Sequence, residues 1–137
     1  MLNTATSYLA LLQDDEVQIK SIALDKLNLL VDEHWSEISD YIKTLKTYYE
    51  NKAIPDKQQV LALILSKIYY NLEDYDSAIE WALESGERFN INEQSLYVST
   101  ILKKIFIKKV NRSQSKLIPE FKQLWIMFSI IVLRKNL

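Results

Sequence analysis

The residues best suited to chemistry are one histidine and three pairs of neighbouring carboxylates. His34 is the single imidazole of the chain, and one imidazole makes neither a zinc site nor a catalytic triad without partners. The pairs, which in principle do acid–base work or bind a cation, are Asp14/Asp15, Asp32/Glu33 and Glu73/Asp74. Each pair falls at an expected helix boundary, where a carboxylate stabilises the positive end of a helix dipole. We therefore interpret the pairs as helix caps and His34 as a helix-start or helix-surface residue.

Other residue types that build active sites are missing from the sequence. The chain has no cysteine, which excludes disulfides, iron–sulfur clusters, thiolate zinc sites and cysteine nucleophiles. It has one glycine, whereas a glycine-rich phosphate loop needs several. It contains no HExxH sequence, serine nucleophile elbow or EF-hand spacing of ligands. We therefore expect no enzymatic activity, no cofactor, no metal ion and no small-molecule substrate.

The scarcity of glycine and proline favours helices joined by short connections. One glycine and two prolines occur in 137 residues, whereas β-hairpin turns need residues that adopt a positive φ. The length is that of one ordinary domain, and the content of 48% hydrophobic and 26% charged residues is typical of a globular protein. The sequence predicts an all-α fold of stacked antiparallel helical hairpins, a tetratricopeptide-like rod of about six or seven helices.

Apolar residues recur at helical spacing along most of the chain. The clearest stripe advances by three and four residues through Trp35, Ile38, Ile42, Leu45 and Tyr49. The expected helices are about residues 4–13, 16–32, 35–49, 56–71, 75–85, 96–110 and 119–134. Such spacing puts each apolar set on one helical face, which is the face that stacked helices bury.

Residues 58–89 form the clearest predicted hairpin. Its expected core residues are Leu61, Ile64, Leu65, Ile68, Ala78, Ile79, Ala82 and Leu83. Asp74 is the expected N-cap of the second helix, and Gly86 is its expected C′ residue. The apolar positions expected in the last predicted helix of the rod are Leu96, Val98, Ile101, Leu102, Ile105, Phe106 and Val110.

The same hairpin resembles one tetratricopeptide unit. Leu65, Tyr69, Tyr75 and Ala78 match packing positions of that pattern, and the stretch EDYDSAIEWAL resembles its turn and second helix. The pattern does not recur at the period of about 34 residues. The hairpin is therefore tetratricopeptide-like and not part of a standard array.

Charge is divided unevenly along the chain. Residues 1–100 carry a net charge of −9, and residues 101–137 carry a net charge of +8. We interpret the basic part either as a surface for an acidic partner or as a segment that packs against acidic protein. It has neither interleaved aromatic residues nor a nucleic-acid motif, so we expect no nucleic-acid partner.

The predicted organisation has two regions, an N-terminal helical-repeat rod at 1–110 and a basic linker with an apolar terminal helix at 111–137. A helix that is apolar on every side must be covered on every side, so we expect a truncated chain whose last helix normally has a neighbour. Its apolar run, 124–133, is shorter than the roughly 20 residues that span a bilayer. We expect a soluble intracellular protein without a membrane partner, because residues 1–12 do not resemble a secretory signal.

Five landmarks occur in an order that resembles a known family. They are LALLQDDE, ALDKLNLLVDEHWSEIS, the stretch Tyr48–Glu50, SKIYYNL and ALESGERFNINEQSLYV. With their spacing, residues 7–107 resemble the N-terminal region of the 26S proteasome non-ATPase regulatory subunit 1 family, whose members are far longer. The resemblance implies a rod of paired helices and a non-catalytic scaffold role in the base of the proteasome regulatory particle. It also implies base and lid subunits as partners, and a part in ubiquitin-dependent protein degradation.

Aromatic side chains are the expected contact residues, because such side chains dominate protein interfaces. The candidate interface or packing anchors are Trp35, Tyr48, Tyr69, Tyr70, Trp81 and Trp125. The residues leave one alternative open, a generic helical-repeat adaptor that binds peptides or partner helices in a concave groove.

Overall fold

The computed structural model describes residues 5–113, with side chains described for residues 5–110. The chain falls into two compact units, Met1–Phe89 and Asn90–Leu137. The first unit holds α1 to α5 and two short 3-10 segments, and the second holds α6. Each unit is described by itself.

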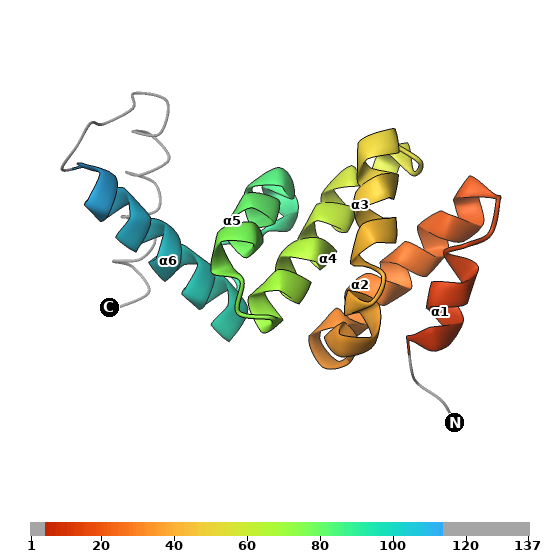
Figure 1. Cartoon of the computed structure of the whole chain (residues 1–137), viewed down its shortest axis with the longest axis horizontal. Coiled ribbons are helices and arrows are strands. Elements are labelled where there is room, and N and C mark those ends of the chain that lie inside the picture. Colours follow the sequence, from red (N-terminus) through yellow and green to blue (C-terminus); the bar gives the residue numbers. More distant parts are fainter. Residues whose placement is uncertain (1–4, 114–137) are drawn as a thin grey trace. The chain divides into compact units, whose positions relative to one another are not determined.

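The elements of the first unit follow one another with short connections (Figure 1). They are α1 (Thr6–Leu11), α2 (Val17–Ser39), α3 (Ile42–Asn51), η1 (Pro55–Lys57), α4 (Gln58–Asn71), α5 (Tyr75–Glu84) and η2 (Gly86–Arg88). Every regular element within residues 5–113 is helical. The predicted all-α class is therefore confirmed.

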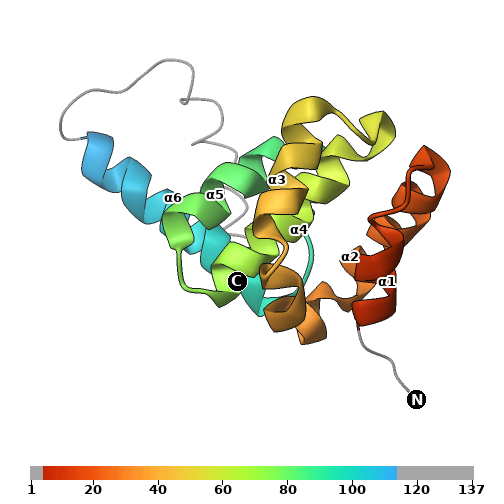
Figure 2. The same ribbon diagram turned by 45° about the vertical axis from the view of Figure 1, so that its right-hand side comes forward.

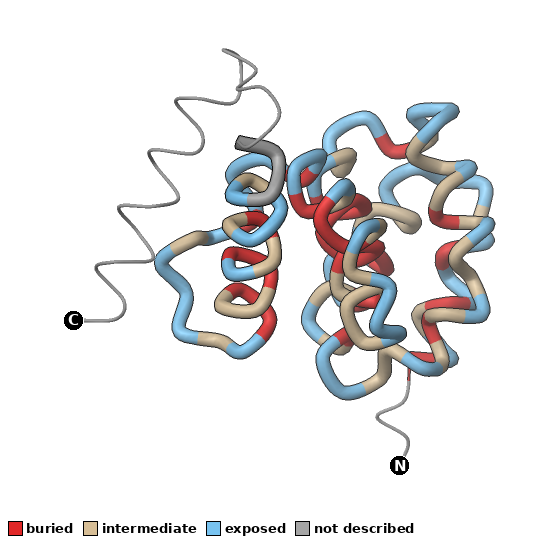
Figure 3. Tube along the Cα trace, turned by 60° about the vertical axis from the view of Figure 1, so that its left-hand side comes forward, coloured by how far each residue is buried: buried red, intermediate tan, exposed pale blue. Residues whose placement is uncertain are grey.

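The centre of the first unit is α4, which lies between α2, α3 and α5 (Figures 1 and 2). It is buried without a break from Val60 to Ser66 and again at Ile68. The four residues predicted for its core are fully buried, and the prediction is confirmed for Leu61, Ile64, Leu65 and Ile68. The neighbouring helices also contain buried residues (Figure 3). Because α4 is covered on most sides, its sequence must be apolar on most sides.

The turn from α4 to α5 follows the prediction. Asp74 caps α5, since its Oδ1 accepts a hydrogen bond from the Ser77 amide at 3.3 Å. The buried Ser66 hydroxyl of α4 donates to the Ala78 carbonyl oxygen of α5 at 2.6 Å. Gly86, just past the end of α5, has a φ of +56°, a conformation that favours glycine. Both the cap and the C′ glycine are confirmed.

Three apolar residues at positions predicted for buried helix faces are exposed, and one of them is Val110, which is 39% exposed. Leu83 of α5 is 46% exposed, because Ala78 and Ala82 make the close approach to α4. Leu96 is 75% exposed at the first position of its helix. Helical spacing assigns residues to one face of a helix, but it does not show how far the neighbouring helices extend over that face.

The predicted helix at 35–49 is wrong in its boundaries. Instead, α2 continues to Ser39 through a kink at His34, whose φ of −115° and ψ of 24° are not helical. The break falls at Asp40 and Tyr41, before α3 begins. Ile38 and the residues after the break keep their periodicity, so the apolar spacing does not reveal the interruption. Tertiary packing overrides local propensity here.

The capping interpretation holds for one carboxylate pair and is wrong for the others. Glu16 is the N-cap of α2 and makes no capping hydrogen bond with its side chain. Asp14 Oδ1 instead accepts a hydrogen bond from the Glu16 amide at 2.9 Å, in the turn before α2. Asp32 lies inside α2, where its carboxylate pairs with Lys67 of α4 at 3.5 Å. Residue type alone did not distinguish a cap from a contact between helices.

The described part of the second unit contains α6 (Leu96–Ser113). The buried residues of this helix are Tyr97, Val98, Ile101, Leu102 and Ile105. The helix continues through residues 111–113, so the predicted end at residue 110 is three residues too early. The predicted terminal helix and Trp125 lie outside the described residues. Within residues 5–113, no helix is long and apolar enough to cross a membrane.

Truncation of the α4 core is expected to destabilise the first unit. Leu65→Ala should lower the free energy of unfolding by about 2–5 kcal/mol, because it leaves a cavity at a fully buried site. Urea unfolding followed by far-UV circular dichroism measures this loss. The matched control is Leu29→Ala, since Leu29 is 74% exposed and should change stability by less than about 0.5 kcal/mol. Equal losses would contradict a core centred on α4.

The left-handed conformation after α5 gives a second test of the fold. Gly86→Ala should cost about 1–2 kcal/mol of stability, because an L-residue is strained at this φ. Gly86→Asn should cost less, since asparagine tolerates the left-handed region better. Urea unfolding of both variants measures the difference. A Cβ atom at position 86 would lie 2.9 Å from Nε2 of Gln59. Equal losses of stability in the two variants would identify this contact, and not the backbone conformation, as the cause.

Candidate functional site

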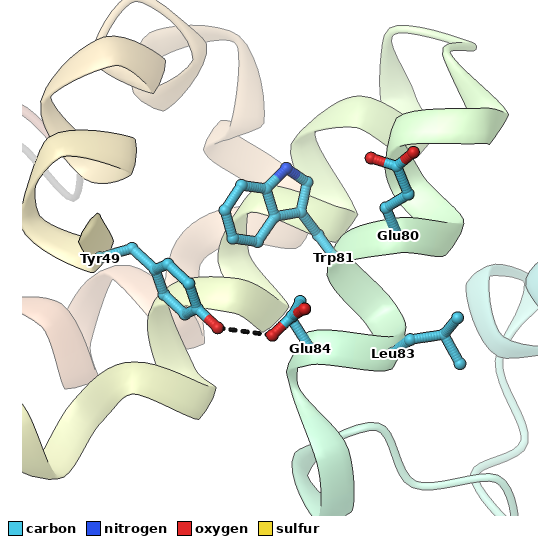
Figure 4. A pocket seen from close by; sticks show the side chains of 5 residues that line it. All are labelled: Tyr49, Glu80, Trp81, Leu83 and Glu84. Atoms are coloured by element: carbon cyan, nitrogen blue, oxygen red, sulfur yellow. Dashed lines mark hydrogen bonds between the residues drawn. The ribbon is translucent and has the colours of Figure 1, made fainter.

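An open pocket of about 350 Å³ lies between α3 and α5. Its lining residues are Tyr49, Glu80, Trp81, Leu83 and Glu84 (Figure 4). Tyr49 comes from the last turn of α3, and the other four residues come from α5. Glu80 and Glu84 are four residues apart, which places them next to each other on one side of the helix.

Tyr49 holds the two walls of the pocket together. Its ring meets the Trp81 ring edge-on, with centroids 5.0 Å apart and an interplanar angle of 89°. This arrangement is one that aromatic pairs prefer. The Tyr49 hydroxyl donates a hydrogen bond to Glu84 Oε2 at 2.7 Å (Figure 4). The backbone of Tyr49 is bound to α4, because Gln58 Nε2 donates a hydrogen bond to the Tyr49 carbonyl oxygen at 3.0 Å.

The same hydrogen bond changes the acidity of the phenol. The Glu84 carboxylate accepts a hydrogen bond from the Tyr49 hydroxyl, and this bond, partial burial and the negative charge of Glu84 raise the pKa of Tyr49 to about 12. Tyr49 therefore remains a neutral donor at physiological pH. One oxygen of Glu84 is held in place by this donor.

The described lining of the pocket combines two aromatic rings, one leucine and two carboxylates. Among residues 5–113, no group of three or more histidine, aspartate and glutamate side chains is placed to hold a metal ion. An aromatic ring beside carboxylates offers a surface for a cationic or apolar group.

Tyr48, a predicted anchor, fastens the end of α1 to α2 and α3. Its hydroxyl donates to the Leu12 carbonyl oxygen at 3.1 Å and accepts from Lys20 Nζ at 3.2 Å. Lys20 also donates to the Leu12 carbonyl oxygen, at 3.1 Å. A carbonyl at the end of a helix needs such a partner. Tyr48 is thus a structural link within the described residues.

The other predicted anchors lie at separate places. Trp35 is half-buried against the core of the first unit. Lys46 Nζ lies 5.2 Å from the centroid of the Tyr69 ring, and the Tyr70 ring lies 6.3 Å from that of Tyr75. Of the predicted set, only Trp81 lines the described pocket. Its role and the roles of the others as interface anchors stay predictions.

The family model for the 26S proteasome subunit RPN2, N-terminal domain, matches residues 3–124. This chain belongs to that family. The match includes all of the first unit from residue 3 onward and all five residues of the pocket. The resemblance drawn from the five sequence landmarks is therefore confirmed.

Alignments with curated proteins of the RPN2 family extend over most of this chain. The "26S proteasome non-ATPase regulatory subunit 1" of Dictyostelium discoideum is 43% identical over 104 residues, which is 75% of this chain and 11% of the relative. The "26S proteasome regulatory subunit RPN2" of Eremothecium gossypii is 42% identical over 116 residues, or 82% and 12% of the two chains. Its counterpart in Saccharomyces cerevisiae is 37% identical over 118 residues, or 84% and 12%. The chain thus spans 11–12% of the length of these relatives.

Sequence reasoning missed most of the pocket in this RPN2 N-terminal domain. The signal on α5 was present, because Glu80 and Glu84 flank Trp81 at a spacing that places carboxylates side by side on a helix. The contribution of Tyr49 had no local signal, since it comes from another helix. Leu83 was assigned to the core, so its place at the pocket was also missed.

The raised pKa of Tyr49 gives a direct test of the pocket geometry. It should be about 12 in a pH titration of ring-labelled tyrosine by NMR, with the resonance assigned through Tyr49→Phe. Glu84→Gln should move this pKa toward 10.0, the ordinary value, because the charged acceptor is lost. The control is Glu80→Gln, which removes the same charge from the same helix and should leave the pKa of Tyr49 high.

The sign of the stability effect follows from the same shift. The folded-state pKa of Tyr49 lies above its unfolded value, so its contribution is complete below pH 10 and is lost as the pH rises through about 12. The difference in unfolding free energy between the wild type and Tyr49→Phe should shrink over this interval. A pH-independent difference would contradict the hydrogen bond to Glu84.

Proposed function

We propose that this chain is a non-catalytic scaffold segment of the 26S proteasome regulatory particle. The observation that carries the proposal is the match of residues 3–124 to the RPN2 N-terminal domain. The names of its relatives, a non-ATPase regulatory subunit and regulatory subunits of the 26S proteasome, support the same role. In this role the chain supports assembly and regulation of ubiquitin-dependent protein degradation.

The segment acts by presenting helix faces and loops to other subunits of the base and lid. The fold supports this action, because α4 is enclosed by its neighbours while the outer faces of α2 and α5 carry exposed apolar residues such as Ile22, Leu29 and Leu83. Exposed apolar residues on a rigid helix are suitable contacts for a partner subunit. We place this activity in the cytoplasm and nucleus, with proteins as partners instead of nucleic acids, membranes or small molecules.

A generic peptide-binding adaptor is the alternative. It is less well supported, because the tetratricopeptide-like pattern occurs once and the family match extends over residues 3–124. An adaptor would bind short peptides without entering the proteasome. The two functions therefore differ in one measurable outcome, which is incorporation into the regulatory particle.

A chimeric yeast subunit tests the proposed function. In the Saccharomyces cerevisiae relative, the stretch of 118 aligned residues is replaced by the matching part of this chain. The chimera should enter 26S particles, as measured by native gel electrophoresis and mass spectrometry of the affinity-purified particle. If the segment acts as a scaffold, helix faces that fit the neighbouring yeast subunits are sufficient for incorporation.

The control is the same chimera with Leu65→Asp, which places a charge at a fully buried site and should abolish incorporation. A third chimera with Asp15→Asn should assemble as the unmodified one does, because this exposed polar residue lies outside the core. A soluble, helical chimera that is excluded from the particle would contradict the scaffold function.

A further inference from the structure

We propose that the pocket at Trp81 is a docking site for a partner protein, and that its occupant is an arginine-bearing amphipathic helix. The inference deepens the proposed function and rests on it for the place of the partner within the regulatory particle. The arginine enters between Trp81 and the carboxylates of Glu80 and Glu84. An apolar residue of the same helix packs on Leu83.

The shape and lining of the pocket fit one long cationic side chain. Its volume of about 350 Å³ lies at the small end of binding sites. Trp81 forms an aromatic wall of the pocket, and its ring packs against the ring of Tyr49 in an edge-on arrangement. Leu83 lines the same pocket and is 46% exposed. The aliphatic stem of an arginine packs on such apolar surface, and its planar guanidinium stacks on a tryptophan face.

The charges of the pocket favour a cation. Glu80 and Glu84 are both exposed, and neither forms an ion pair with a described residue. The Tyr49 hydroxyl occupies Glu84 Oε2, which leaves Oε1 available to a partner. A guanidinium can donate to both carboxylates at once, because its donors form a rigid fork.

The negative field extends beyond these two residues. Residues 72–88 contain a single cation, Arg88, and six exposed carboxylates. The six are Glu73, Asp74, Asp76, Glu80, Glu84 and Glu87. A surface of one sign attracts a partner of the opposite sign and disfavours partners of the same sign. Charge complementarity therefore specifies a basic partner.

Local helix electrostatics do not favour the placement of Glu80 and Glu84, although Glu84 accepts a hydrogen bond from Tyr49. Glu84 is the last residue of α5, where a carboxylate opposes the negative end of the helix dipole. Like charges four residues apart also repel on a helix surface. Residues that break a local rule of this kind are typical of functional sites. The cap Asp74, by contrast, stabilises the other end of the same helix.

The spacing along α5 fits a helix as the carrier of the arginine. Asp76, Glu80 and Glu84 follow one another at intervals of four residues, which is a single row on the helix surface, and Leu83 lies beside this row, three residues after Glu80. A helix lying along this row meets three carboxylates with one apolar residue next to them. Amphipathic helices that bind in this way repeat their anchors at the same intervals.

The test uses the 137-residue chain labelled with ¹⁵N and a synthetic helical peptide of about 18 residues, since shorter isolated helices are marginal in water. The peptide carries arginine and leucine at intervals of three and four on one face, and a matched peptide has glutamine for each arginine. The indole resonance of Trp81, assigned through Trp81→Phe, should shift saturably with the arginine peptide. The glutamine peptide should bind at least about tenfold more weakly.

Variants of the chain locate the effect. The double variant Glu80→Gln/Glu84→Gln should weaken binding of the arginine peptide about fivefold to tenfold, as expected for two exposed ion pairs. Its control, Asp15→Asn/Glu33→Gln, removes the same charge from exposed positions outside the pocket and should change binding less than about twofold. Circular dichroism of each variant establishes that it is folded.

Three results would overturn the inference. The arginine peptide could leave the Trp81 resonance unchanged, or the double variant could bind it as tightly as the wild type does. Third, the Trp81 resonance could shift when salt is added without peptide, by an amount that does not depend on protein concentration. That result would mean that basic residues of the same chain fill the pocket. The yeast chimera separates these failures from failure of the proposed function. If it assembles while the peptide does not bind, only the docking site is wrong.

Discussion

The burial of α4 is the constraint on which the rest of the first unit depends. From Val60 to Ser66 every residue of this helix is buried, so it must be covered on several sides at once. Its neighbours α2, α3 and α5 supply that cover. Burial of a leucine or isoleucine side chain stabilises a fold by about 1.5–3 kcal/mol. The aliphatic residues of α4 therefore contribute more than any polar contact in the unit, and the other helices are arranged to enclose them.

Polar contacts from α4 orient its neighbours more than they stabilise them. Lys67 pairs with Asp32 of α2 at 3.5 Å, but the Asp32 side chain is 70% exposed. Exposed pairs of this kind contribute about 0–1 kcal/mol. The bond from Ser66 to the Ala78 carbonyl is different, because the hydroxyl is buried and would be costly without an acceptor. That acceptor exists only when α5 lies at one position along α4. The pair therefore selects the register of the hairpin.

Features that depend on neighbouring residues could be predicted from the sequence, and features that depend on distant ones could not. The core face of α4, the cap Asp74 and the glycine Gly86 all follow from local spacing and local conformation. The kink at His34 carries no proline or glycine signal, and the apolar spacing continues through the break that follows it. The pocket illustrates the same limit. Glu84 and its helix were visible in the sequence, but the pairing with Tyr49 joins residues 35 positions apart.

The pocket links recognition to the stability of the fold. Tyr49 connects the pocket to the helix core, because its carbonyl oxygen accepts a hydrogen bond from Gln58 of α4 while its hydroxyl donates one to Glu84 of α5. A partner that binds only this native arrangement stabilises it by about 2.7 kcal/mol at a free concentration one hundred times its Kd. That gain is similar to the loss caused by removing one buried leucine side chain. If the proposed partner binds at the pocket, assembly strengthens the same helix contacts that form the pocket. Weakening the α4 core and weakening the partner contact should therefore affect incorporation in the same direction, although they act on different residues.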